Sequence, residues 1–397
     1  MCSDQIPGEK NSRLNIVHYA VIFFYSISPL LYFLRTWEKG SFIVSVLLRS
    51  IEPLLIMITA IAILYHGFFR VNKYIIVMLI VTGYAVSVGL IMGNEARYVL
   101  GGLSHVLAGL LLFWYMRCHN HSEELLERFL KTTIKVTIYF FAISIIVLLK
   151  SKEILGVSLY IGLASQVLLL AVFWAFQYRA SWSLLASLGL IFMSGKRGVI
   201  VAAAFGMLIM TGASLIKRGK TILKLGSIGL VALLLLNLIG VNVVQSRSVK
   251  KVISFTETGL TEYSSGRLDE IKSALGEWKS QPLKVVFGSG FGFSYTYIYS
   301  DEQFPDVPNY HNVHFSPLNV LIIWGVPLSL FILICFTGML WKIRGPLVGP
   351  GGVARVTVYA LVFYSFFVFN IFNEPLLWTL VGMLSGIRSK NHLLPKG

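Results

Sequence analysis

Long apolar runs separated by short polar connectors make up most of this 397-residue chain. A helix needs about 20 mostly apolar residues to cross a bilayer, and runs near that length recur from end to end. The pattern therefore predicts an all-α fold, a polytopic transmembrane helix bundle. The predicted spans cover residues 14–34, 42–66, 74–93, 98–116, 132–149, 156–176, 180–194, 198–216, 221–241, 315–340, 355–372 and 374–389.

The composition agrees with a membrane protein. Apolar residues make up 56% of the chain and charged residues 13%, whereas soluble domains carry about 25% charged residues. The net charge of +16 is explained by Lys and Arg concentrated in one set of predicted loops, so we expect those loops and both termini in the cytoplasm and no nucleic-acid partner. The first apolar run is long enough to span, which favours a first membrane helix over a cleavable signal peptide. The three cysteines, Cys2, Cys118 and Cys335, are too far apart in sequence to suggest a disulfide framework.

One long polar segment, residues 242–314, interrupts the pattern and lies on the outer side in this topology. It contains seven basic and eight acidic residues and many aromatic ones, and a loop of this length is usually functional or disordered. Its aromatic content favours an ordered structure. We therefore divide the chain into a nine-span bundle (1–241), an outer loop region (242–314) and a three-span bundle with a cytoplasmic tail (315–397).

Part of the outer loop has a helical pattern. Ser265 is a suitable cap, and Leu268, Ile271, Leu275 and Trp278 recur at helical spacing. The following run, residues 288–292, is Gly-Ser-Gly-Phe-Gly, which lacks the spacing of a nucleotide-binding loop. It predicts a tight turn with close backbone packing.

Two adjacent cations, Lys196 and Arg197, stand between apolar runs on the outer side. Lys and Arg suit a phosphate or diphosphate, and the helix expected from Val199 adds a partial positive charge. The alternative is a simple turn with snorkelling cations. Arg97 is a candidate third cation for the same anion site, or a partner of Glu95.

Arg267 is a further candidate because Arg in a first helical turn opposes the helix dipole. A surface salt bridge to Asp269 or Glu270 is its alternative role. At the end of the outer loop, His311 and His314 are candidates for a general base, since the pKa of His lies near working pH. A hydrogen-bonded loop histidine is the alternative for each. No acidic residue or Cys nearby completes a metal site, so we expect none.

Three further titratable residues have structural interpretations. Glu52 lies inside the second predicted span, where a charge should face other helices or sit near an end. His105 lies inside the fourth span and is interpreted as a hydrogen-bonding partner of a neighbouring helix. Glu374 precedes Pro375 and is interpreted as part of a turn.

The layout and several short motifs resemble the O-antigen polymerase and O-antigen ligase superfamily. The run 194–198 resembles its Ser-x-x-Arg-Gly stretch before a span. Arg267 followed by Trp278, Pro282 and residues 288–290 resembles its Arg…Trp…Pro…Gly-x-Gly loop pattern. His314 with Leu318 and Gly325 resembles its His…Leu…Gly stretch. Many relatives have Asn directly after the His, which here fits His311, while the distance to Gly325 favours His314.

The resemblance implies a GT-C-like fold and a metal-independent, inverting glycosyltransferase without a cofactor, in the bacterial inner membrane. Its donor would be a glycan on undecaprenyl diphosphate, and its acceptor a glycolipid hydroxyl at the periplasmic face. Arg197 and Arg267, assisted by Lys196 and Arg97, would hold the diphosphate. His314, or alternatively His311, would be the base. Membrane lipids, a flippase and a chain-length regulator are the implied partners.

The same resemblance fits a polymerase of O-antigen, capsule or exopolysaccharide repeat units and a ligase that acts on lipid A-core. We favour the polymerase, because the outer loop lacks the net positive charge suited to a phosphorylated lipid A-core. A transporter or flippase of a lipid-linked or anionic substrate is the other class that twelve spans allow. The near absence of acidic residues in the spans argues against ion coupling.

Overall fold

The computed structural model describes residues 14–37, 42–68, 73–119, 121–150, 165–193, 196–212, 267–299, 305–311, 313–367 and 371–391. These residues are mostly helical, as predicted, with one small sheet. The elements are α1 (Ile16–Trp37), α2 (Phe42–Tyr65), α3 (Lys73–Ile91), α4 (Ala96–Cys118), α5 (Glu123–Lys150), η2 (Ser165–Val167), α6 (Leu168–Gln177), α7 (Ser181–Met193), α8 (Arg197–Gly212), α12 (Arg267–Lys279), α13 (Pro282–Phe287), β1 (Tyr295–Tyr297), β2 (Val307–Tyr310), α14 (Ser316–Lys342), α15 (Gly349–Tyr364), η4 (Ser365–Phe367), η5 (Ile371–Asn373) and α16 (Pro375–Asn391).

Eleven of the twelve predicted spans correspond to described helices. The remaining one, 221–241, lies outside the described residues. The helix predicted at 132–149 begins nine residues earlier, at Glu123, and only residues 165–177 of the span predicted at 156–176 are described. Among the described residues, three helices are long and apolar enough to cross a membrane: α3, α4 and α14. Six shorter apolar helices accompany them. The number of spans stays a prediction.

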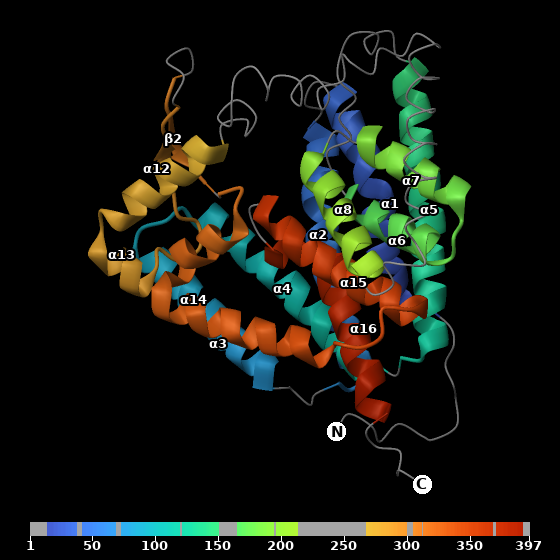
Figure 1. Cartoon of the computed structure of the whole chain (residues 1–397). Helices are drawn as coiled ribbons and strands as arrows, with labels where there is room; N and C mark the ends of the chain where they lie inside the picture. Colours follow the sequence, from blue (N-terminus) through green and yellow to red (C-terminus); the bar gives the residue numbers. More distant parts are fainter. Residues whose placement is uncertain are drawn as a thin grey trace.

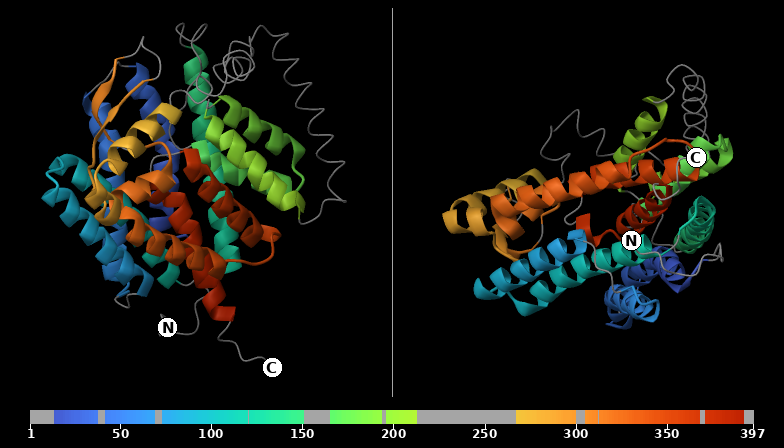
Figure 2. Two further views of the ribbon diagram at one scale, coloured as in Figure 1. Left: turned by 60° about the vertical axis from the view of Figure 1, so that its left-hand side comes forward. Right: turned by 90° about the horizontal axis from the view of Figure 1, so that it is seen from below.

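The helices form two packed groups (Figure 1). In one group α1 packs against α2 and α5, and α15 packs against α6 and α8; in the other, α3 packs against α4 and α14. Helix α4 joins the groups, because it also contacts α2 and α16. Seen from below, α14 lies in a separate layer from α3 and α4 (Figure 2). Fully buried aromatic residues, among them Phe113, Phe129 and Trp324, fill the interior.

Helices α12 and α13 and the two strands lie together at one end of α3 and α14 (Figure 1). The strands pair antiparallel, with Tyr295 opposite Tyr310 and Tyr297 opposite Val307. The all-α prediction did not include this sheet. We call residues 267–314 the loop module; its residues 300–304 and 312 are not described.

The helix predicted in the loop module is present as α12. Of its four apolar residues at helical spacing, Trp278 is buried, and Ile271 and Leu275 pack against the core. Leu268 is exposed, whereas Asp269, Glu270, Ala274 and Trp278 are buried. Three of the buried residues are spaced by four, so they follow one row along the helix. The row contains a carboxylate because the buried end of the helix faces a polar site and not an apolar core, as described below.

The glycine run packs backbone against backbone, as predicted. The N–H of Gly290 donates to the carbonyl of Ile323 on α14 (3.0 Å), and the N–H of Phe291 donates to that of Ala85 on α3 (3.0 Å). A Cβ on Gly290 would lie 2.1 Å from the backbone nitrogen of Gly89. The loop module is thereby fixed to both helices through the main chain.

Helix α14 is interrupted where the loop module meets it. Gly325 has φ 70° and ψ 169°, and Pro327 follows two residues later. A Cβ on Gly325 would lie 2.2 Å from the carbonyl oxygen of Val286 on α13. The break therefore allows α13 to approach the backbone of α14.

Replacement of Gly290 by Ala tests this attachment. The variant must place a side chain at φ +71° and against the backbone of Gly89, and the left-handed conformation alone costs about 1–2 kcal/mol. We expect a clear loss of thermal stability in detergent, measured by tryptophan fluorescence. Gly276→Ala on α12 is the matched control, because no atom lies within 4 Å of its added Cβ and Ala favours a helix. Equal melting temperatures of the two variants would contradict this attachment.

Candidate functional site

Lys196 lies directly before α8, and its carbonyl accepts the N–H groups of Val199 (3.1 Å) and Ile200 (3.4 Å). Its side chain is half-buried. Burial lowers the pKa of Lys196 to about 8, the carboxylate of Glu374 opposes that shift, and the charge of Arg267 adds to it. The charges of these two residues therefore act on Lys196, although all three lie far apart in the sequence.

Arg197 is the first residue of α8. Its side chain, and the whole of Ser194 and Gly195 before it, lie outside the described residues. The backbone shows that α8 begins at Arg197, two residues before Val199, where the sequence predicted its start. The partial positive charge of that helix start lies beside Lys196.

Arg267 is the first residue of α12 and is half-buried. Its charge acts on Lys196, so the starts of α8 and α12 each contribute a cation to one region. A helix start with adjacent cations favours an anion. The anion site predicted for Arg197, Arg267, Lys196 and Arg97 stays a prediction.

Glu374 precedes α16 and is a buried carboxylate, which the turn interpretation missed. Its Oε2 accepts a hydrogen bond from Nε2 of Gln166 (2.8 Å), and its Oε1 accepts one from the hydroxyl of Tyr25. The same hydroxyl accepts the N–H of Leu376 at the start of α16 (2.8 Å). Burial raises the pKa of Glu374 to about 7, against the hydrogen bonds from Tyr25 and Gln166 and the charge of Lys196.

Glu270 and His314 form the second part of the site. Glu270 lies one turn after Arg267 on α12, and its side chain is only 4% exposed, whereas that of His314 is 37% exposed. Nδ1 of His314 lies 2.9 Å and 3.0 Å from the two carboxylate oxygens. The backbone N–H of His314 donates to Oε1 (2.8 Å), as does the hydroxyl of Tyr295 (3.3 Å).

This arrangement orients His314 for proton transfer. A carboxylate that holds Nδ1–H fixes the tautomer in which Nε2 carries the lone pair. It also stabilises the imidazolium that forms when Nε2 takes a proton. The alternative role predicted for Glu270, a salt bridge to Arg267, does not account for these contacts.

His311 has different surroundings. Its Nδ1 lies 2.8 Å from the carbonyl oxygen of Phe293, and its ring stacks on Tyr98 with the centroids 3.7 Å apart. The guanidinium of Arg97 lies 4.6 Å from the Tyr98 ring centroid, and its Nε lies 2.7 Å from Oε2 of Glu95. The structure therefore groups His311 with Arg97 and groups His314 with α12.

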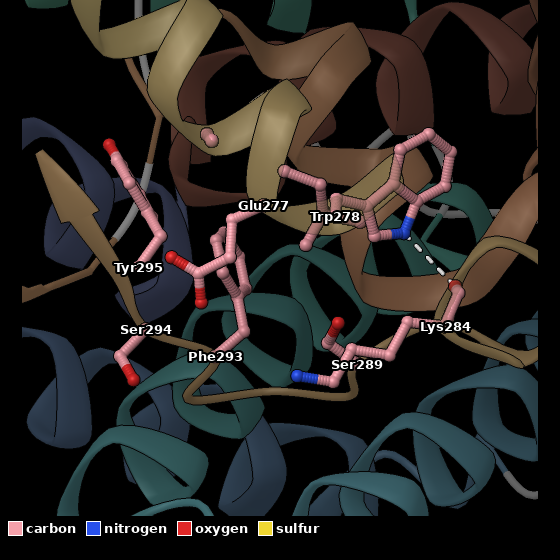
Figure 3. A pocket seen from close by; sticks show the side chains of 9 residues that line it. Glu277, Trp278, Lys284, Ser289, Phe293, Ser294 and Tyr295 are labelled. Carbon is pink, nitrogen blue, oxygen red and sulfur yellow. Dashed lines mark hydrogen bonds between the residues drawn. The ribbon is translucent and has the colours of Figure 1, made fainter. Parts of the chain in front are cut away.

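A small pocket lies beside the loop module's sheet (Figure 3). Glu277, Trp278, Phe293 and Tyr295 are among its lining residues, and Nε1 of Trp278 donates to the carbonyl of Lys284 (3.0 Å). Its volume of about 20 Å³ is enough for a water molecule but not for a sugar ring. The pocket therefore adds no glycan-binding site.

Sequence reasoning singled out four cations and two histidines as candidates, but it gave the two buried carboxylates, Glu270 and Glu374, only minor structural roles. Glu270 was considered only as a possible partner of Arg267 in a surface salt bridge. Its spacing of four from Ala274 and eight from Trp278 is a signal for the true face. No such signal marks Glu374, whose partners Tyr25 and Gln166 are more than 200 residues away in sequence.

Residues 182–333 match the family model described as O-antigen ligase. The match contains Lys196, Arg197, Arg267, Glu270 and both candidate histidines, and confirms the resemblance inferred from the sequence motifs. Together with the apolar helices, it indicates a membrane protein of surface-polysaccharide synthesis. The comparison with curated proteins finds no match.

Replacement of Glu270 tests the local geometry without an activity assay. Glu270→Ala leaves the backbone N–H and Nδ1 of His314 without their acceptor. The cost is about 1–3 kcal/mol for a fully buried donor and less at His314, whose side chain is 37% exposed. We expect faster hydrogen–deuterium exchange of the peptide around residues 313–316. Glu277→Ala is the control on the same helix, because Glu277 accepts the N–H of Thr296 (3.0 Å) and should affect residues 295–297. Unchanged exchange at His314 in Glu270→Ala would contradict the described contact.

Proposed function

We propose that this protein is a metal-independent, inverting glycosyltransferase of the bacterial inner membrane. It moves a glycan from undecaprenyl diphosphate to a hydroxyl of an acceptor glycolipid at the periplasmic face. The observation that carries the proposal is the combination of an oriented histidine, His314, with an anion site at Lys196 and Arg267. These residues lie within or between helices of the segment that matches O-antigen ligases.

The proposed reaction is a single displacement. The acceptor oxygen forms a bond to the anomeric carbon while the bond from that carbon to the diphosphate oxygen breaks. The hydroxyl proton passes to Nε2 of His314, and Glu270 stabilises the resulting imidazolium. Undecaprenyl diphosphate leaves with the electron pair of the broken bond. Its added negative charge is stabilised by Lys196 and Arg267, together with Arg197 at the start of α8.

The proposed topology places both termini in the cytoplasm and the loop module in the periplasm. The domains proposed are the bundle of residues 1–241, the loop region 242–314 and the bundle 315–397. The polyprenyl chain of the donor would lie among the apolar helices. We propose that Arg97 makes only a peripheral contact with the donor, because its guanidinium is already paired with Glu95 and its side chain is exposed. A flippase supplying the donor and a chain-length regulator are proposed partners.

We propose a polymerase that lengthens lipid-linked repeat units of O-antigen, capsule or exopolysaccharide. The observation behind this choice is the charge of the outer loop region, residues 242–314, which contains seven basic and eight acidic residues. A phosphorylated lipid A-core would favour a surplus of cations. The matching family model is described as O-antigen ligase, which makes a ligase that uses lipid A-core the second candidate.

Complementation distinguishes these functions. The gene is expressed, with a matched glycan cluster, in cells that lack either the polymerase or the ligase. Surface polysaccharide is then examined on gels. We expect a ladder of chain lengths only in the polymerase-deficient cells. Rescue of the ligase-deficient cells alone would establish the second candidate, and substrate-dependent transport that survives Arg267→Ala and His314→Ala would favour a transporter.

We expect replacement of His314 and replacement of His311 to give different outcomes in the same assay. Loss of a general base costs about 10²–10⁴-fold in rate, so His314→Ala is expected to abolish the ladder. His311→Ala removes a ring stacked on Tyr98 and should leave a weaker ladder. Membrane expression of each variant is checked by immunoblot. A normal ladder from His314→Ala with none from His311→Ala would assign the base to His311.

A further inference from the structure

Three exposed cations gather where α3 begins and α14 ends, and we call them the basic patch. Lys73 is the first residue of α3, Lys342 is the last residue of α14, and Arg344 follows two residues later. Nζ of Lys342 lies 4.5 Å from the ring centroid of Tyr74, and Nζ of Lys73 lies 5.6 Å from the same centroid. Two ammonium groups from helices far apart in the sequence therefore share one aromatic ring.

The turn after α14, which carries Arg344, is held by hydrogen bonds from α15. Nε of Arg355 donates to the carbonyl of Ile343 (2.8 Å), and its Nη1 donates to that of Pro346 (2.8 Å). The guanidinium of Arg344 lies 4.1 Å from the ring centroid of Trp341, whose side chain is 64% exposed. The turn therefore presents Arg344 at the surface in a fixed position, beside an exposed aromatic ring.

The basic patch lies at the height expected for lipid head groups. Among the described helices, α3 and α14 are two of the three that are long and apolar enough to cross a membrane, so their ends are expected at its surface. Trp341 is of a residue type enriched at the boundary between lipid and water. Further along the two helices, apolar side chains are exposed, among them Ile76 and Ile80 on α3 and Leu330 and Ile334 on α14. Cations and lipid-facing apolar residues thus occur together on the same pair of helices.

The charge of these segments is positive without an acidic counterpart of their own. Residues 53–94, which include α3, and residues 307–373, which include α14, contain no Asp or Glu. The end of a helix favours a cation such as Lys342, but the start of a helix disfavours one such as Lys73. The ammonium groups of Lys73 and Lys342 also repel each other across the Tyr74 ring. An anion bound at this surface therefore lowers the free energy of the patch.

We propose that the basic patch binds the phosphate of an anionic phospholipid, of which phosphatidylglycerol is the test case. Lys73, Lys342 and Arg344 contact the phosphate, and the acyl chains lie along the exposed apolar side chains of α3 and α14. Basic surfaces between membrane helices are suited to anionic head groups. The inference does not rest on the proposed glycan transfer, because the loop module contacts α3 at Ala85 and Gly89, near the other end of that helix.

The test places the full chain in vesicles and uses phospholipids with brominated acyl chains, which quench the fluorescence of a nearby tryptophan. The signal of Trp341 is identified as the part that Trp341→Phe removes. We expect brominated phosphatidylglycerol to quench it at a mole fraction at least fivefold lower than brominated phosphatidylcholine. One cation near a membrane surface contributes about fivefold in affinity for anionic lipid, so Lys73→Gln and Lys342→Gln should each reduce the preference about fivefold. Equal quenching by the two lipids in wild type, or an unchanged preference in both variants, would overturn the proposal.

Lys131→Gln is the matched control for net charge. Lys131 on α5 also lies near a tryptophan ring, that of Trp174 at 5.7 Å, but its Nζ is paired with Glu127 at 2.7 Å. The variant should keep the preference for phosphatidylglycerol, whereas a loss equal to that of Lys342→Gln would assign the preference to the overall positive charge and overturn the proposal.

A soluble competitor separates a lipid from a free phosphate. Glycerol phosphate at millimolar concentration has the same phosphate group but no acyl chains, and we expect it to leave the quenching by phosphatidylglycerol unchanged. Complete displacement of the lipid by glycerol phosphate would show that the patch takes a soluble anion, which contradicts the proposal. This comparison uses wild type, so it holds even where a Gln variant does not fold.

Discussion

Charge buried between apolar helices requires a partner of opposite charge or a full set of hydrogen bonds, and this constraint organises the described site. Two carboxylates meet it in different ways. Glu270 accepts hydrogen bonds from the backbone N–H and Nδ1 of His314, whereas Glu374 accepts them from Tyr25 and Gln166. Glu270 thereby holds His314 in place. Removal of these donors would leave each buried carboxylate without compensation.

Helix α12 connects the two halves of the site. Arg267 at its start acts on Lys196, and Glu270 one turn later holds His314. The helix keeps its place because the adjoining glycine run is bonded through the main chain to α3 and α14. Backbone contacts of this kind leave no room for side chains, so the glycines determine where the charged residues of α12 lie.

The sequence was a good guide to the helices, since apolar runs of spanning length are a strong signal. It also predicted the close packing at Gly290 and a helix from about Val199, which begins two residues earlier at Arg197. It failed at the first turn of α12, where Glu270 is buried and the apolar residue Leu268 is exposed. It failed again for Glu374, whose role depends on Tyr25 and Gln166. Contacts between residues so distant in the chain arise from the packing of helices, which periodicity does not encode.

The central claim is that His314, oriented by Glu270, activates the acceptor for a single displacement at the anomeric carbon. The most direct measurement is the anomeric configuration of the bond formed by purified protein in nanodiscs, determined by NMR of the product. Displacement from undecaprenyl diphosphate in one step predicts a configuration opposite to that of the donor linkage. A product that retains the donor configuration would contradict this account, because retention requires a covalent intermediate or another mechanism.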